Sequence, residues 1–119
     1  MKHLLLILSL FFTVFCSSQK MNNEKLTKIY TAFSDSITGD DGYWQFYKSG
    51  HVFISISDKA NNRMRIIMPL VHLEDLKMKS FQEAREANFH TALDVKYAIS
   101  DDVMWSIFVH PLKELSKSQ

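Results

Sequence analysis

Apolar and polar side chains alternate along residues 93–109, the pattern of strands that bury one face. The apolar positions are Leu93, Val95, Tyr97 and Ile99, and then Val103, Trp105, Ile107 and Val109. A three-residue loop at 100–102 pairs Tyr97 with Trp105 and puts every apolar position on one face, whereas a two-residue loop mixes the faces. We therefore predict a hairpin with a three-residue loop, in which Asp102 adopts a left-handed conformation.

The same alternation predicts a second hairpin over residues 43–57. A three-residue loop ending at Gly50 uses the left-handed freedom of glycine and pairs Phe46 with Val52. The opposite face then carries the aromatic and imidazole side chains of Tyr43, Tyr47, His51 and Phe53. If no helix covers that face, it is a candidate partner or dimer surface, and the alternative is that it packs against the first helix.

Helical spacing of apolar residues predicts three helices. The first begins at a cap formed by Asn22 or Asn23 and ends at Gly39. A serine-to-glutamate capping box predicts the second helix over residues 80–88. Pro111 suits the first turn of a short terminal helix.

A third strand is expected at residues 63–68, where Pro69 ends it because proline cannot donate to a ladder. The predicted order is therefore helix, three strands, helix, two strands, helix. The expected fold class is α+β, α-βββ-α-ββ-α, with a five-stranded, mostly antiparallel sheet and helices packed on one face. We expect residues 20–119 to form one domain.

The first residues have the layout of a secretory signal peptide over residues 1–18. The apolar run from Leu4 to Phe15 is shorter than the ~20 residues that span a membrane as a helix. Cleavage after Ser18 would release an exported protein, in the periplasm, in the cell envelope or secreted. Cys16 could instead be the lipidated first residue of a lipoprotein, although the bulky Phe15 before it argues against this.

The balance of basic and acidic residues bears on which kinds of partner the protein can bind. Without Lys2, 13 basic residues balance 13 acidic ones, so nothing points to nucleic acid. We expect membrane association only if Cys16 is lipidated. Because Cys16 is the single cysteine, the exported domain has no disulfide, and its stability must come from packing, which a homodimer would help.

Three polar side chains are the best candidates to lie close together in the fold and form a site: Asn88, Asp94 and His110. In the predicted register, Asp94 and His110 are diagonal neighbours about 7–8 Å apart. A histidine oriented by an aspartate can act as a general base. The structural interpretation is that His110 and Asn88 satisfy backbone groups where helices meet the hairpin ends.

No nucleophile accompanies this set, the five histidines lack metal-ligand spacing, and the three glycines fall in turns rather than in a phosphate loop. We therefore predict that the protein is not an enzyme and has no metal and no cofactor. The alternative is a small-ligand-binding protein or hydrolase with a pocket near Asp94 and His110.

The amino-acid sequence of residues 87–112 resembles that of the YbjN-like family, the bacterial sensory transduction regulators. The matching residues are Asn88, Ala92-Leu93-Asp94, Trp105-Ser106 and His110-Pro111-Leu112, with weaker agreement at Arg65-Ile66 and Pro69-Leu70. The resemblance implies a fold like that of type III secretion chaperones of the Tir-chaperone class. In that case Asn88, Asp94, Trp105, His110 and Pro111 are structural motif residues.

The resemblance further implies a protein-binding or regulatory module, often dimeric, whose partner the sequence does not identify. This chain departs from secretion chaperones in its export signal and its short terminal helix, which makes effector chaperoning a poor inference. The kinship also depends on the predicted register. It falls if Tyr97 and Trp105 lie on opposite faces of the sheet.

Overall fold

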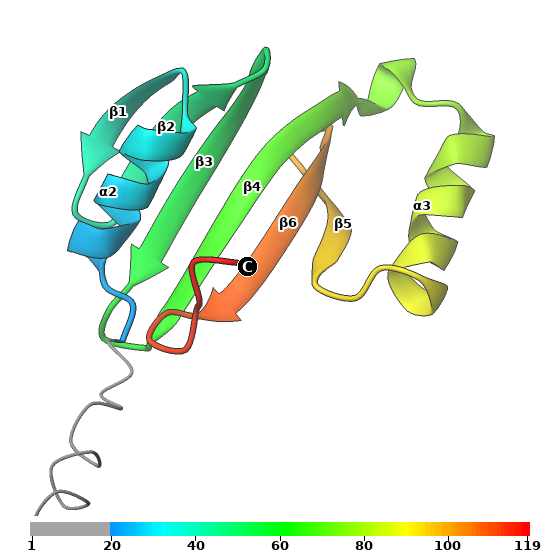
Figure 1. Ribbon diagram of the computed structural model, residues 1–119. Helices are drawn as coiled ribbons and strands as arrows, with labels where there is room; N and C mark the ends of the chain where they lie inside the picture. The colour runs from blue at the N-terminus through cyan, green and yellow to red at the C-terminus, as the bar shows by residue number, and fades with distance from the viewer. Residues whose placement is uncertain (1–19) are drawn as a thin grey trace, which may run out of the picture.

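The computed structural model describes residues 20–119, which form a six-stranded antiparallel sheet with two α-helices (Figure 1). The elements are α2 (Asn23–Phe33), β1 (Ser36–Asp40), β2 (Tyr43–Lys48), β3 (His51–Asp58), β4 (Arg63–His72), the 3-10 turn η2 (Leu73–Asp75), α3 (Met78–His90), β5 (Val95–Ser100) and β6 (Val103–Pro111). The strand order is β1-β2-β3-β4-β6-β5. The α+β class is confirmed, whereas the predicted signal peptide and Cys16 lie outside the described residues.

The sixth strand is β1, which the sequence analysis assigned to the first helix. The predicted cap is confirmed, because Asn22 Oδ1 accepts a hydrogen bond from the Lys25 amide at 2.9 Å. The helix ends at Phe33, however, because Ser34 is extended. The chain then returns along β2 as β1, where Gly39 has a φ of +87° and no room for a side chain.

The predicted terminal helix is absent from the described chain. Pro111 is the last residue of β6, opposite Arg63, and residues 112–119 form turns. Asn62 holds the start of these turns, because its carbonyl accepts from the Leu112 amide at 3.2 Å and its Oδ1 from the Lys113 amide at 2.8 Å. A proline at the end of a strand has no ladder bond to lose, so the position does not require a helix.

Both hairpins use two-residue loops, so both predicted registers are wrong. Ser49 and Gly50 have φ values of 52° and 79°, and Asp101 and Asp102 have φ values of 52° and 58°. Two consecutive residues with positive φ make a type I′ turn, whose twist matches that of the strands it joins. The prediction failed because both faces of these strands carry apolar residues, so counting apolar pairs does not select the register.

The corrected register separates the two aromatic residues of the second hairpin. Tyr97 lies opposite Ser106, and Trp105 lies opposite Ala98. Side chains of directly paired residues share a face and successive residues alternate, so Tyr97 and Trp105 point to opposite faces of the sheet. The predicted pairing is wrong, and by the criterion given above the YbjN-like kinship and the role inferred from that kinship fall with it.

Pro69 does not end its strand. β4 continues to His72, with a bulge between Pro69 and Val71, and Pro69 pairs with Trp105 of β6. The ladder between β3 and β4 stops at Ile67, so at Pro69 the strand has β6 as its only partner. The missing N–H is tolerated there because one side of the strand is already unpaired.

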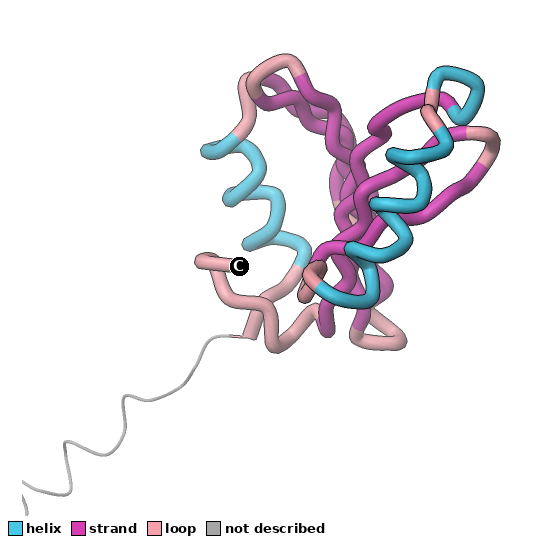
Figure 2. The backbone as a smooth tube through the Cα atoms, turned by 90° about the vertical axis from the view of Figure 1, so that its right-hand side faces the viewer, coloured by secondary structure: helices cyan, strands magenta, loops and turns pink. Residues whose placement is uncertain are grey.

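We define the inner face of the sheet as the side on which α2 packs. Viewed along the sheet, α2 and the C-terminal segment lie on the same side of the strands (Figure 2). The core is the cluster of Met21, Leu26, Tyr30, Trp44, Phe46, Met64 and Leu112. By contrast, α3 lies beside the edge strand β5 (Figure 1), and Ala84 is its one buried residue. The second helix of the prediction is confirmed over residues 80–88, but it covers little of the sheet.

Candidate functional site

The structure does not bring Asn88, Asp94 and His110 together. The Asn88 side chain bonds to the backbone of Tyr97 in β5, with Nδ2 donating to the carbonyl at 2.8 Å and Oδ1 accepting from the amide at 2.7 Å. Asp94 is exposed just before β5, and within residues 20–119 no hydrogen bond or ion pair joins it to His110. The diagonal arrangement of Asp94 and His110 depended on the register that proved wrong.

His110 instead anchors the end of the chain. Its Nδ1 lies 2.8 Å from the carbonyl oxygen of Pro111, which can only accept, so Nδ1 carries the proton. Nε2 is then the acceptor for the Gln119 side-chain amide at 3.2 Å. The imidazole also stacks on Phe108, with 5.9 Å between ring centroids. These contacts hold the C-terminal segment against the inner face.

The predicted aromatic surface is divided between the two faces. Tyr43 and Tyr47 lie on the outer face and are 50% and 42% exposed. Phe53 lies opposite Phe46 on the inner face, where the two rings stack with centroids 5.3 Å apart. His51 pairs with Lys48 beside the turn and therefore shares the side of Phe46. Tyr43, Tyr47, His51 and Phe53 thus do not form one patch.

The outer face of the sheet carries an extended group of apolar residues. They are Val52, Ile54, Ile56, Ile67, Pro69, Trp105, Ile107 and Val109, bordered by Tyr43, Gln45 and Tyr47 of β2 and by charged residues that include Asp58, Arg63, Arg65 and Lys96. At its centre Ile54, Ile67 and Ile107 form a continuous row across β3, β4 and β6. Of the two α-helices in residues 20–119, α2 packs on β1 and β2 and α3 on β5, so neither covers this face.

Sequence reasoning missed the outer face because it assigned Ile54 and Ile56 to the covered side. The signal was present in residues 52–54, where three consecutive apolar residues, Val52, Phe53 and Ile54, put apolar side chains on both sides of the strand. A strand that is apolar on both sides is expected in a sheet that is buried on both faces.

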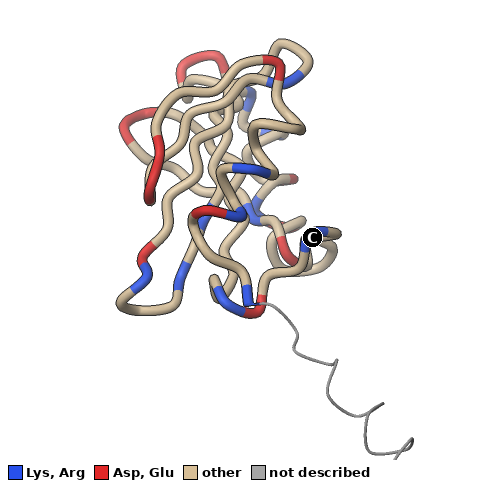
Figure 3. The backbone as a smooth tube through the Cα atoms, turned by 60° about the vertical axis from the view of Figure 1, so that its left-hand side comes forward, with Lys and Arg blue, Asp and Glu red and all other residues tan. Residues whose placement is uncertain are grey.

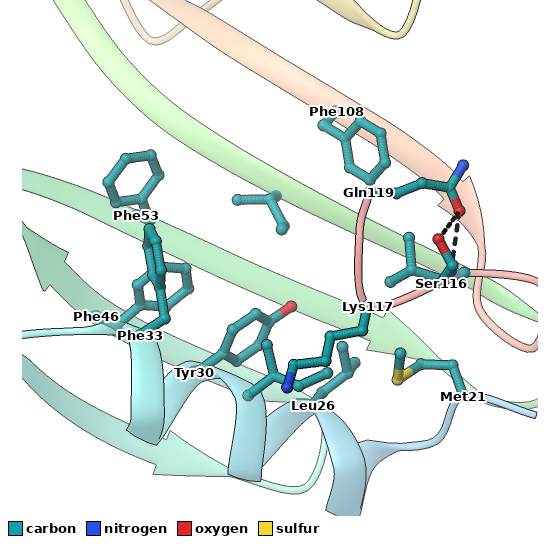
Figure 4. Close-up of a pocket in the computed structure, with 13 residues that line it drawn as sticks. Met21, Leu26, Tyr30, Phe33, Phe46, Phe53, Phe108, Ser116, Lys117 and Gln119 are labelled. Carbon is teal, nitrogen blue, oxygen red and sulfur yellow. Dashed lines mark hydrogen bonds between the residues drawn. The ribbon is translucent and has the colours of Figure 1, made fainter. Parts of the chain in front are cut away.

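A pocket on the inner face lies between α2, the middle strands and the C-terminal segment (Figure 4). Its volume is about 270 Å³. Leu26, Tyr30 and Phe33 of α2 form one wall, and Phe53 and Phe108 lie across the pocket from them (Figure 4). The sequence analysis offered a candidate pocket near Asp94 and His110. Neither residue lines the pocket on the inner face, although His110 contacts one of its lining residues, Gln119.

Burial changes the ionisation of one group beside the pocket. Desolvation raises the pKa of the Tyr30 hydroxyl above its usual value, and the hydrogen bond with Ser55 at 2.7 Å opposes this effect more weakly. On the opposite rim of α2, the Asn23 amide donates to Asp41 at 2.9 Å and lowers the pKa of that carboxyl, with a further contribution from Lys59. The Tyr30 hydroxyl is therefore engaged by Ser55, and the Asp41 carboxylate by Asn23 and Lys59.

A second apolar region is formed by α3 and β5. Phe89 and Leu93 are 85% and 86% exposed, the two highest values among the large apolar residues. Phe89 lies in the last turn of α3, Leu93 lies in the connection to β5, and Val95 and Tyr97 of β5 are 45% and 39% exposed. These residues are individually more exposed than the central isoleucines of the outer face.

In residues 20–119, no three histidine, cysteine or acidic side chains gather closely enough to hold a metal ion. No helix in that range is long and apolar enough to cross a membrane. Comparison with protein-family models finds none that matches this chain, and comparison with curated proteins finds no relative. The described residues thus form an α+β fold with an open antiparallel sheet, an apolar outer face, a pocket on the inner face and an exposed apolar region at α3 and β5.

Proposed function

We propose that this chain is an exported, non-enzymatic protein-binding module that self-associates through the outer face of its sheet. The observation that carries the proposal is the row of Ile54, Ile67 and Ile107 at the centre of a sheet face on which neither α2 nor α3 packs. Monomeric soluble proteins rarely leave a contiguous apolar patch of this kind exposed, and such patches mark protein interaction sites. The export signal in residues 1–18 is the support for the location.

The pattern of the outer face favours a second copy as the partner. In a face-to-face dimer, a twofold axis can lie between the two sheets and run along the row of Ile54, Ile67 and Ile107, across the strands. Each residue two positions before the row then lies over the residue two positions after the row on the same strand of the other copy. Tyr43 then meets Tyr47 and Ile56 meets Val52 of the other copy. A face with this internal symmetry can complement itself, as a twofold interface requires.

The charged residues on this face include Asp58, Arg63, Arg65 and Lys96, and of these Arg65 is the one within the apolar rows. Arg65 lies two positions from Ile67 along β4, on the opposite side from Pro69. The twofold operation therefore places it over Pro69 and Trp105 of the other copy and not over a second arginine. A guanidinium above an indole ring is a favourable contact, worth about 0.5–1 kcal/mol when partly exposed.

The proposal does not depend on the YbjN-like resemblance. That resemblance relied in part on Tyr97 and Trp105 sharing a face, and they do not. A dimeric, protein-binding role nevertheless suits the domain on physical grounds. A chain of about 100 residues has a modest core, and association removes apolar surface from water.

Size-exclusion chromatography with light scattering tests self-association on residues 19–119. The core cluster lies entirely within these residues, so this part carries the whole described fold. We expect a mass that rises from one toward two copies as the concentration increases. A mass of one copy at every concentration, up to the millimolar range, would contradict the proposal.

A further inference from the structure

The inner-face pocket has the form of a binding site for a small apolar chain. It is lined by aromatic and aliphatic side chains from α2, β2, β3, β4 and β6, and is closed on one side by residues 115–119 (Figure 4). The pocket has a volume of about 270 Å³ and is partly open to solvent, so a ligand can enter it.

The positive charge at the rim of the pocket indicates which head group a bound ligand would carry. Lys117 is the one charged side chain among the lining residues, and none of them is acidic. Within the described chain, no acidic side chain forms an ion pair with Lys117. In Figure 4 its side chain extends along the rim toward Tyr30 and Leu26, and Figure 3 shows further Lys or Arg positions close to the C-terminus.

The other polar groups of the pocket are already engaged within the protein. The Tyr30 hydroxyl bonds to Ser55, and no buried side-chain nitrogen or oxygen in residues 20–119 lacks a partner. Gln119 Oε1 accepts from the Ser116 amide and hydroxyl at 2.9 and 3.1 Å, and its Nε2 donates to His110. The Lys117 ammonium is the charged donor at the mouth that is left for a ligand.

We propose that this pocket binds the hydrocarbon chain of a small amphiphilic carboxylate, whose head group pairs with Lys117. The volume equals that of about nine water molecules at ~30 Å³ each, which suits a chain of about eight to ten carbons. Apolar lining with a single charged group at the mouth is the usual composition of a small-ligand site. Residues 115–119, which His110 tethers through Gln119, form the part of the wall that can move to admit the chain.

This inference is independent of self-association, because the pocket and the isoleucine row lie on opposite faces of the sheet. Octanoate is the test ligand and 1-octanol its uncharged counterpart, titrated into residues 19–119 while the methyl NMR signals of Leu26, Ile29 and Ile66 are recorded. We expect saturable shifts of these signals with both ligands, and tighter binding of octanoate.

Two substitutions and a control separate chain binding from head-group binding. Lys117→Glu should weaken octanoate binding about tenfold and leave octanol binding unchanged, because attraction at an exposed site becomes repulsion. Leu115→Trp should fill the pocket and abolish both. Lys79→Glu, which reverses a charge on the distant α3, should change neither.

The proposal is overturned if octanoate gives no saturable shifts of the pocket methyl groups. It is equally overturned if Lys117→Glu weakens octanol and octanoate to the same extent, since Lys117 would then act on the pocket rather than on the carboxylate.

Discussion

The side-chain amide of Asn88 is paired with both backbone groups of Tyr97, with bonds of 2.8 and 2.7 Å. An asparagine side chain in this position replaces the backbone of a neighbouring strand. It therefore occupies the hydrogen-bonding groups that the edge strand β5 would otherwise present to another chain. Lys96 strengthens the junction, because its ammonium donates to the Asn88 and Ala92 carbonyls at the end of α3. Unprotected edges promote aggregation, so Asn88 directs association away from β5.

Replacement of Asn88 by alanine should open this edge. We expect hydrogen exchange at the Tyr97 amide to accelerate at least tenfold and the free energy of unfolding to fall by about 2 kcal/mol, because two hydrogen bonds with a usual net value of about 1 kcal/mol each are lost. Asn61→Ala, which removes a bond within an exposed turn, is the control and should leave exchange at Tyr97 unchanged. Unaltered exchange in Asn88→Ala would show that the pairing contributes nothing to the edge.

The turn between β5 and β6 distinguishes the observed register from the predicted one. Asp101 has a φ of 52°, a conformation that glycine adopts without strain and alanine does not. Asp101→Gly should therefore raise the free energy of unfolding by about 0.5 kcal/mol, and Asp101→Ala should lower it by about 1 kcal/mol. A three-residue loop, with Asp101 at negative φ, predicts the reverse order of the two variants, and thermal unfolding would reveal it.

The buried hydrogen bond between Tyr30 and Ser55 should behave as a coupled pair. Tyr30→Phe leaves the fully buried Ser55 hydroxyl without a partner, which should cost about 1–3 kcal/mol. The double variant Tyr30→Phe with Ser55→Ala removes both polar groups and should recover most of that loss. A double variant whose loss equals the sum of the two single losses, in urea unfolding, would mean that the two side chains are not coupled.

Stability at alkaline pH should also depend on Tyr30. Because burial raises its pKa in the folded state, its contribution is complete below the ordinary tyrosine pKa of about 10 and is lost as the pH rises through the folded-state value. The decrease in unfolding free energy between pH 8 and about pH 11 should therefore be smaller in Tyr30→Phe than in the wild type. Tyr43 and Tyr47 are half exposed and present in both proteins, so Tyr43→Phe is the matched control. An equal decrease in wild type and Tyr30→Phe would contradict this assignment.

Helices and strands could be predicted from the sequence wherever a local pattern, such as a helix cap or an alternation of apolar residues, was sufficient. Asn22 caps α2 as expected, and the helix over residues 80–88 and the approximate positions of five strands agree with the structure. The prediction that Gly39 ends the first helix was wrong. Gly39 has the positive φ that suits a helix end, but it lies within β1, because the helix already ends at Phe33.

Register and faces were not predictable from apolar pattern alone. The strands around Ile54 and Ile107 are apolar on both sides, so shifting the pairing by one residue exchanges one apolar face for another. Turn chemistry carried the missing information, since Ser49-Gly50 and Asp101-Asp102 can each take two positive φ values. The pocket could not be predicted, because residues 115–119 form its wall through contacts of Gln119 with His110 that no local pattern specifies.

The most direct test of the account is sedimentation equilibrium of residues 19–119 with Ile67→Lys and, as a control, Phe89→Ser. Ile67 is at the centre of the outer face, and Phe89 is the exposed apolar residue of the α3 surface. We predict a monomer–dimer equilibrium for the wild type and for Phe89→Ser, and a monomer for Ile67→Lys with an unchanged circular dichroism spectrum. A wild type that stays monomeric, or a dimer that Ile67→Lys leaves intact and Phe89→Ser dissociates, would contradict the outer face as the interface.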